Sequence, residues 1–319
     1  MTSIAHLTDI HLPNDPALRF GEFSLKRFMG YMNWHRSRKL MHQFAVLGLL
    51  QDDISQHDVD HIFVSGDLVN LGLEAEFVAG AEWLAALGTP GDVSFVPGNH
   101  DYYGSGRAFM RGTAFTQFMM SDEAGLALGG DTGPELPFVR VIDGDVAVIG
   151  LNSGMPTPLL KAYGEISSQQ LKRLRDILDA CRAADLYRCV VVHHPPLPGL
   201  TRRSRAMRND DAVMKLLEEH GAELVLYGHN HRQQHTRLKT VHGVCHVVGT
   251  PSASVARGGH YDPGRYNLFN ISGGPGGWMT ELAGRGLSLQ HDRVSDLGTI
   301  SLNSADDYDL KDQLVGTPQ

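Results

Sequence analysis

The sequence predicts an α/β fold in which short buried strands alternate with helices. Short apolar runs rich in β-branched or aromatic residues, and bounded by glycine or proline, predict strands at residues 4–8, 61–65, 93–96, 188–192 and 223–227. Between them, apolar residues at helical spacing predict helices at 37–56, 74–87, 167–183 and 210–220. This alternation indicates a largely parallel or mixed sheet.

Further strands are predicted later in the chain. Residues 138–142 and 145–151 flank Asp143-Gly144, a pair typical of a tight hairpin turn. A second set follows at 235–240, 244–250, 265–271 and 277–283, with a turn at the glycine- and proline-rich stretch 273–277. We expect one domain over residues 1–285 and a polar tail over 286–319.

The amino-acid composition indicates the general class of the protein and its expected surroundings. The 319 residues are 42% hydrophobic and 20% charged, as in ordinary globular proteins, and the formal net charge of −8 argues against nucleic acid as a partner. The 3 cysteines lack the even, regular spacing of a disulfide framework, which favours a reducing compartment. The N-terminus shows no secretory pattern, and no apolar run is long enough to span a membrane. We expect a cytoplasmic protein and leave peripheral membrane contact open.

Candidate ligands for metal ions stand at or just after the ends of the predicted strands, where open α/β sheets bind their ligands. They are Asp9, His11, Asp67, Asn99, His193, His229 and His231. Asp9 and His11 are two residues apart, so in an extended chain their side chains would point the same way. The sequence therefore predicts that distant segments converge on one site.

These nitrogen and oxygen ligands, without thiolate, suit Mn, Fe, Zn or Co, and Mg less well. Seven ligands exceed the needs of one tetrahedral site. They suit two metals about 3.5–4 Å apart that share a bridging carboxylate, an arrangement that acidifies water and neutralises charge on a phosphoryl group.

Five motifs in order carry a family resemblance. The series Asp9-x-His11, Gly66-Asp67, Gly98-Asn99-His100-Asp101, His193-His194-Pro195 and Gly228-His229-Asn230-His231 resembles the calcineurin-like metallophosphoesterase superfamily, in particular its bacterial phosphodiesterase-type members. The resemblance covers about residues 1–256 in pieces. It implies a four-layer sandwich of two mixed β-sheets flanked by helices.

The resemblance also implies roles. Asp9, His11 and His231 would hold the first metal, whereas Asn99, His193 and His229 would hold the second. Asp67 would bridge them, and His194 would be a neighbour of His193. His100 would contact the substrate phosphate and protonate the leaving group. Asn70 replaces an acidic residue that orients this histidine in some members. Either Asp101 or another group would then orient His100, or His100 would act only through its charge or hydrogen bonding.

The function expected is hydrolysis of a phosphoester, most specifically a phosphodiester, by a hydroxide that bridges the two metals, with Asp67 and His100 as catalytic residues. One alternative is hydrolysis of a lipid-linked or nucleotide-linked pyrophosphate. Another, from a different class, is a non-catalytic interaction scaffold that the metals stabilise. The sequence does not indicate an oligomeric state.

Two basic segments have open roles. Residues 19–39 hold six Lys or Arg against one Glu, mixed with aromatic residues. They suit an ordinary amphipathic helix start, a cap that binds an anionic substrate, or a membrane contact through Phe28, Tyr31, Met32 and Trp34. The loop 201–208 is either solvated or a phosphate-binding loop. Its candidate substrate residues are Arg202, Arg203, Arg205 and Arg208.

Overall fold

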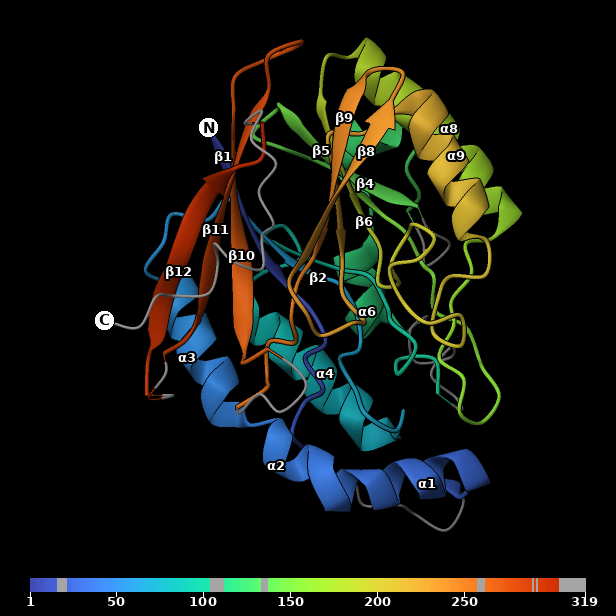
Figure 1. Cartoon of the computed structure of the whole chain (residues 1–319), viewed down its shortest axis with the longest axis vertical. Coiled ribbons are helices and arrows are strands. Elements are labelled where there is room, and N and C mark those ends of the chain that lie inside the picture. Colours follow the sequence, from blue (N-terminus) through green and yellow to red (C-terminus); the bar gives the residue numbers. More distant parts are fainter. Residues whose placement is uncertain are drawn as a thin grey trace.

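The computed structural model describes residues 1–15, 22–103, 112–132, 137–256, 262–288, 290 and 292–303. Within these residues, two six-stranded sheets face one another, and helices cover them from outside (Figure 1). The expected α/β sandwich of two mixed sheets flanked by helices is confirmed. Both sheets mix parallel and antiparallel pairs.

The first sheet has the order β12-β11-β10-β1-β2-β3, and the second has the order β4-β5-β6-β7-β9-β8. The strands are β1 Thr2–Leu7, β2 His61–Val64, β3 Val93–Phe95, β4 Phe138–Ile142, β5 Val146–Gly150, β6 Tyr187–Val191, β7 Leu224–Tyr227, β8 Gln234–Thr240, β9 Gly243–Gly249, β10 Arg265–Ser272, β11 Met279–Leu287 and β12 Val294–Ser301. The predicted hairpin joins β4 to β5, and Asp143 and Gly144 both have positive φ angles, as its tight turn requires.

The helices are α1 Leu25–Asn33, a π-helical segment Trp34–Arg38, α2 Lys39–Met41, α3 Phe44–Ile54, α4 Glu74–Leu87, α6 Thr113–Thr116, a 3₁₀ turn Gln117–Met119, α7 Glu123–Ala127, α8 Ser168–Ala183 and α9 Asp210–His220. Ser167 caps α8, because its side chain accepts a hydrogen bond from the N–H of Gln170. No helix among the described residues is long and apolar enough to cross a membrane.

The core lies on both faces of the second sheet. Along β6, Cys189 and Val191 face the first sheet, whereas Val190 packs with Ile177 of α8 and Val213 of α9. Alternate residues of a strand point to opposite faces, so a continuous apolar run is what a strand covered on both sides requires. The parallel strands β1, β2 and β3 in one sheet and β5, β6 and β7 in the other bring their carboxyl ends to a common region.

The helix predicted over 37–56 is interrupted. His42 and Gln43 adopt extended backbone between α2 and α3. His42 forms a β-bridge with Val255, and the N–H of Gln43 donates to the carbonyl of Ser254. A contact with a distant segment thus overrides the local helical pattern.

The basic aromatic segment 19–39 is helical from Leu25 onward, and residues 19–21 lie outside the described part. Ser24 caps α1 by accepting a hydrogen bond from the N–H of Arg27. Phe28 and Met32 are exposed, whereas Trp34 is only 1% exposed. The expectation that Trp34 contacts a membrane is therefore wrong, because the indole is already packed inside the protein.

The polar tail expected over 286–319 is wrong for its first half. Strand β11 continues to Leu287, and residues of β12 pair antiparallel with it. No residue of the edge strand β12 is fully buried, and its pairing with β11 uses backbone hydrogen bonds, which leave no apolar period in the sequence. Residues 304–319 lie outside the described part.

Candidate metal centre

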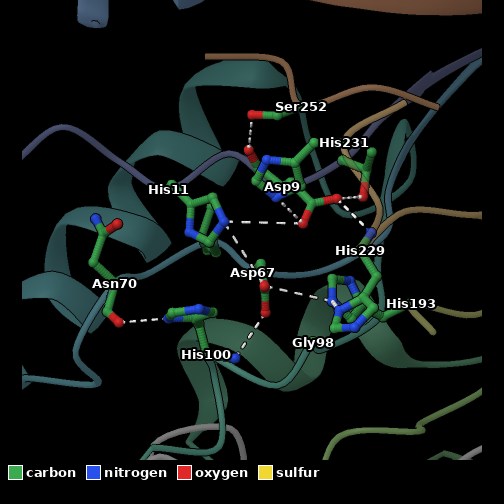
Figure 2. Close-up of polar contacts among 12 residues, drawn as sticks. Asp9, His11, Asp67, Asn70, Gly98, His100, His193, His229, His231 and Ser252 are labelled. Atoms are coloured by element: carbon green, nitrogen blue, oxygen red, sulfur yellow. Dashed lines mark hydrogen bonds and ion pairs between the residues drawn. The ribbon is translucent and has the colours of Figure 1, made fainter. Parts of the chain in front are cut away.

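Polar side chains from five loops converge where β1, β2, β3, β6 and β7 end (Figure 2). Two groups made only of predicted ligands have donor atoms that all lie within 4.8 Å of one another, and two further groups add His100 and His194 respectively. The groups are Asp9, His11 and His231; Asp9, Asp67 and His193; His11, Asp67 and His100; and His193, His194 and His229. The fold thus gathers residues separated by more than two hundred positions in the chain.

Asp9, His11 and His231 form one side of the centre. The Nε2 atom of His231 lies 2.9 Å from Oδ1 of Asp9, and the Nε2 atom of His11 lies 3.9 Å from the same oxygen. The other oxygen of Asp9 accepts hydrogen bonds from the N–H of His229 and the hydroxyl of Thr8. These bonds fix the carboxylate so that its remaining oxygen faces the two imidazoles.

Asp67 lies between the two sides. Its Oδ2 atom is 3.8 Å from Nε2 of His11 and 3.5 Å from Nε2 of His193. Its Oδ1 atom accepts a hydrogen bond from the N–H of His100. Asp67 is 2% exposed, so this carboxylate is positioned to serve both sides without access from bulk water.

His193 and His229 form the other side, and Asn99 is buried on the loop after β3. Nδ1 of His229 lies 3.2 Å from Nε2 of His193, whose Nδ1 donates to the carbonyl of Ser65. The ring of His194 packs 4.5 Å from that of His229, centroid to centroid, and its Nδ1 is hydrogen-bonded to Ser153. His194 therefore contacts the ring of the candidate ligand His229 as well as following His193 in the chain.

Five of the predicted ligands have left-handed backbone. The φ angles are 50° at Asp9, 41° at His11, 52° at Asp67, 67° at His229 and 53° at His231. The expectation that Asp9 and His11 converge along an extended chain is wrong, since both lie beyond the end of β1 at Leu7. Their side chains converge through backbone turns that non-glycine residues adopt at a cost of about 1–3 kcal/mol each.

Two glycines allow the loops to approach. Gly66 has φ of 93°, and a Cβ there would come within 2.6 Å of Nδ1 of His193. A Cβ on Gly228 would collide with the hydroxyl of Thr8 and the carboxylate of Asp9. The glycine in each motif is thus required by the packing of the neighbouring ligand loop.

The electrostatics of the site favour cations. Burial opposes a charge on His193, but the carboxylate of Asp67 outweighs it and raises the pKa of His193 to about 9. Burial lowers the pKa of His11 and His229 well below the usual value, so both are neutral at pH 7 and offer lone pairs. The field that stabilises a proton on His193 would equally stabilise a metal cation in its place.

The donor set fits two metals with nitrogen and oxygen ligands. Nε2 of His11, Oδ1 of Asn99 and Nε2 of His229 are buried and make no hydrogen bond to the residues that the structure describes. A buried polar atom without a partner costs about 1–3 kcal/mol, which a metal ligand bond would offset. Asp67 lies between His11 and His193, so its carboxylate would be shared by both ions.

His100 is oriented by a group that the sequence did not reveal. Its Nδ1 donates to the backbone carbonyl of Asn70 at 2.6 Å (Figure 2). The ring of His100 also stacks on that of Tyr103. Asp101 instead accepts backbone N–H groups of Leu68, Val69 and Gly98. It therefore ties the Asp67 loop to the Asn99 loop and does not orient His100.

Three further residues were missed by sequence reasoning. Nη2 of Arg38 lies 3.3 Å from Nε2 of His100, the ring of His42 packs 4.9 Å from that of His11, and the hydroxyl of Ser252 donates to the carbonyl of Asp9. None lies in a motif or next to a ligand. Only the basic character of 19–39 signalled the approach of Arg38.

The four arginines of the loop 201–208 lie in different surroundings. Arg205 is half-buried, and its Nη2 donates to the carbonyl of His229 at 2.6 Å. Arg208 stacks over Tyr163 and pairs with Glu165. Arg203 lines a cleft with Arg208, and Arg202 is exposed. Of the four, Arg205 contacts a ligand-bearing loop, and substrate binding by the set stays a prediction.

The chain was compared with known proteins. The model of the calcineurin-like phosphoesterase family matches residues 2–233. No curated protein matches. A dimetal phosphatase from Danio rerio is 13% identical, with a TM-score of 0.59, and the match covers 92% of this chain and 98% of that one.

Two larger proteins share the fold. The purple acid phosphatase PPD1 from yellow lupin is 10% identical, with a TM-score of 0.54, and the match covers 94% of this chain and 53% of that one. The sulfate thiohydrolase SoxB from Thermus thermophilus is 16% identical, with a TM-score of 0.51, and the match covers 92% of this chain and 58% of that one. This chain thus spans little more than half the length of either. The family match covers most of the chain and includes all the motifs at the converging loops, and the protein belongs to the calcineurin-like phosphoesterase family.

Proposed function

We propose that this protein is a phosphodiesterase that depends on two metal ions. The observation that carries the proposal is the position of Asp67, whose Oδ2 faces His11 on one side and His193 on the other at 3.8 and 3.5 Å. With Asp9, His231, His229 and Asn99, the chain offers a complete set of nitrogen and oxygen donors for Mn, Fe, Zn or Co.

When bound, two such ions supply an acidified water at neutral pH and neutralise charge on a phosphoryl group. The chain's own part is to hold the donors rigidly. The N–H groups of His100 and His229 fix the oxygens of Asp67 and Asp9 that face away from the other ligands. Positioning of this kind removes reorganisation from the reaction itself.

His100 and Arg38 stand where a substrate phosphate would meet the centre. Burial is the main cause that lowers the pKa of His100 to about 4, aided by the charge of Arg38 and opposed by that of Asp67, so the ring is neutral at pH 7. Because Nδ1 donates to Asn70, the proton is on Nδ1, and Nε2 accepts from Arg38. We therefore assign His100 to orienting Arg38 toward the phosphate, in place of the proton donation expected from the family resemblance.

The test is reconstitution of chelator-stripped protein with Mn, Fe, Zn or Co, followed by metal analysis and assay. Bis(4-nitrophenyl) phosphate, 4-nitrophenyl phosphate and a nucleotide-linked pyrophosphate are compared. We expect two ions per chain and the highest kcat/KM on the diester. Two ions without turnover on any of the three would indicate a scaffold, and turnover on the pyrophosphate alone would replace the diester as substrate.

A further inference from the structure

A cleft of about 670 Å³ lies between α1 and the two loops that contain Leu159–Ala162 and Ser204–Arg205. Helix α1 runs along the lower end of the molecule in Figure 1, apart from the strands of both sheets. The metal ligands do not line this cleft. It is therefore a separate feature that the proposed chemistry does not explain.

The lining exposes apolar side chains to water. Met29 and Met32 from α1 are 41% and 36% exposed, and Leu159 and Leu160 opposite them are 36% and 80% exposed. Met29 and Met32 are three residues apart, so they lie on the same face of the helix. Large apolar side chains that are exposed together in one concave surface indicate a binding site for an apolar group.

Cations share this surface. Lys26, Arg36, Lys161 and Arg205 line the cleft, and no carboxylate is among the described residues that do so. The charged side chains that line the cleft are thus positive, whereas the whole chain carries a formal net charge of −8. Its chemistry suits an anion that carries an apolar part.

The cleft continues toward the metal centre. A smaller cavity of about 110 Å³, lined by Arg38 and His100, shares Gly30, Asn33 and Tyr103 with the larger cleft. The N–H of His100 in turn donates to Asp67. On the other wall, Arg205 lines the cleft and donates to the carbonyl of His229. The cleft thus adjoins both the cavity at His100 and the loop that carries the candidate ligand His229.

We propose that this cleft binds the apolar chain of the substrate, so that the protein acts on phosphodiesters in which one ester group carries a long alkyl or acyl chain. The proposal rests on the phosphodiesterase function proposed above. Met29, Met32 and Leu159 cover the chain, and the cations of the cleft face the charged end. The short helix α1 and the loop around Leu159 therefore set substrate preference, while the strand-end loops hold the metals.

The test uses the full chain with Mn and two substrates that differ only in the chain, methyl and octyl 4-nitrophenyl phosphate. Water supplies the oxygen of the new P–O bond and the P–O bond to nitrophenol breaks, releasing nitrophenolate, the alkyl phosphate and two protons. We expect kcat/KM for the octyl ester to exceed that for the methyl ester by about 100-fold, since each buried methylene group favours binding. Equal values would overturn the proposal.

Variants locate the preference. Met32→Ser and Leu159→Ser should each lower the octyl-to-methyl ratio by about tenfold. Met279→Ser is the matched control, because Met279 is 49% exposed and lies outside the cleft, and it should leave the ratio unchanged. A ratio that falls equally in the control and the cleft variants would contradict the proposal. Thermal unfolding confirms that each variant is folded.

A measurement of ligand binding distinguishes a failure of this proposal from a failure of the proposed function. Calorimetry of octyl phosphate and methyl phosphate with the Mn-loaded protein requires no turnover. Octyl phosphate should bind at least tenfold more tightly, and Met32→Ser should remove that advantage. If neither ester is hydrolysed but this difference holds, the phosphodiesterase function fails and the cleft stands as an amphiphile site. Equal binding of the two phosphates would overturn the cleft whatever the activity.

Discussion

The N–H of His100 donates to one oxygen of Asp67 at 2.7 Å, which leaves the other oxygen to face imidazoles on both sides of the centre. The two oxygens of this buried carboxylate thus have separate tasks. One is held by the loop after β3, and the other is directed at candidate metal ligands. The hydrogen bond thus explains how a flexible carboxylate side chain is kept between His11 and His193.

Replacing Asp67 by Asn tests the bridging charge, because the side chain keeps its shape and its carbonyl oxygen can still accept from His100. We expect bound metal to fall from two ions to one or none, and kcat on bis(4-nitrophenyl) phosphate to fall at least about 1000-fold. Metal analysis and steady-state kinetics measure both. A variant that retains two ions and full activity would refute the bridging role.

Asp101 supports the site through the backbone. Its oxygens accept N–H groups of Leu68, Val69 and Gly98, and the carboxylate is fully buried. Asp101→Asn replaces an acceptor by a donor there, so we expect the free energy of unfolding to fall by about 1–3 kcal/mol. Urea denaturation with a chelator present measures this. Asp145→Asn, on an exposed turn, is the control and should change little.

The role of His100 is tested by the leaving group. If the ring orients Arg38 and donates no proton, His100→Asn should lower kcat/KM by about 10–100-fold for 4-nitrophenyl and alkyl leaving groups alike. A general acid matters most for the poorer leaving group. A loss confined to the alkyl ester would therefore restore His100 as the proton donor. Arg38→Lys should lower kcat/KM similarly for both esters.

The buried side chain of His61, away from the candidate metal ligands, makes the free energy of unfolding depend on pH. It is 1% exposed and bonded to Ser94, and burial lowers its pKa to about 3. Below the unfolded value of about 6.5, the unfolded chain binds the proton that the folded chain excludes. Stability is therefore lost as the pH falls from about 6.5 toward 3, by about 1.4 kcal/mol per unit for this group.

His61→Gln should make the slope of unfolding free energy against pH shallower by about that amount, whatever it does to stability at pH 7. Urea denaturation between pH 5 and 7 measures the slope. An unchanged slope would show that His61 is protonated in the folded state.

Sequence alone predicts that the candidate ligands converge, because each follows an apolar strand and parallel strands bring their ends together. The same reasoning fails for Arg38 and for the carbonyl of Asn70, since neither a remote side chain nor a backbone group has a signature in the sequence. It also fails at His42, where pairing with Val255 breaks a regular helical pattern. Contacts between distant segments decide all three.

The left-handed backbone at five ligands has a consequence for the protein without its ions. Asp9, His11 and Asp67 each hold a conformation that glycine would adopt more readily, and the cost persists whether or not metal is bound. Metal binding would therefore offset the conformational free-energy cost of these residues. In a cell short of the right metal, the chain would open more often and be degraded sooner, so metal supply would set the abundance of this protein as well as its activity.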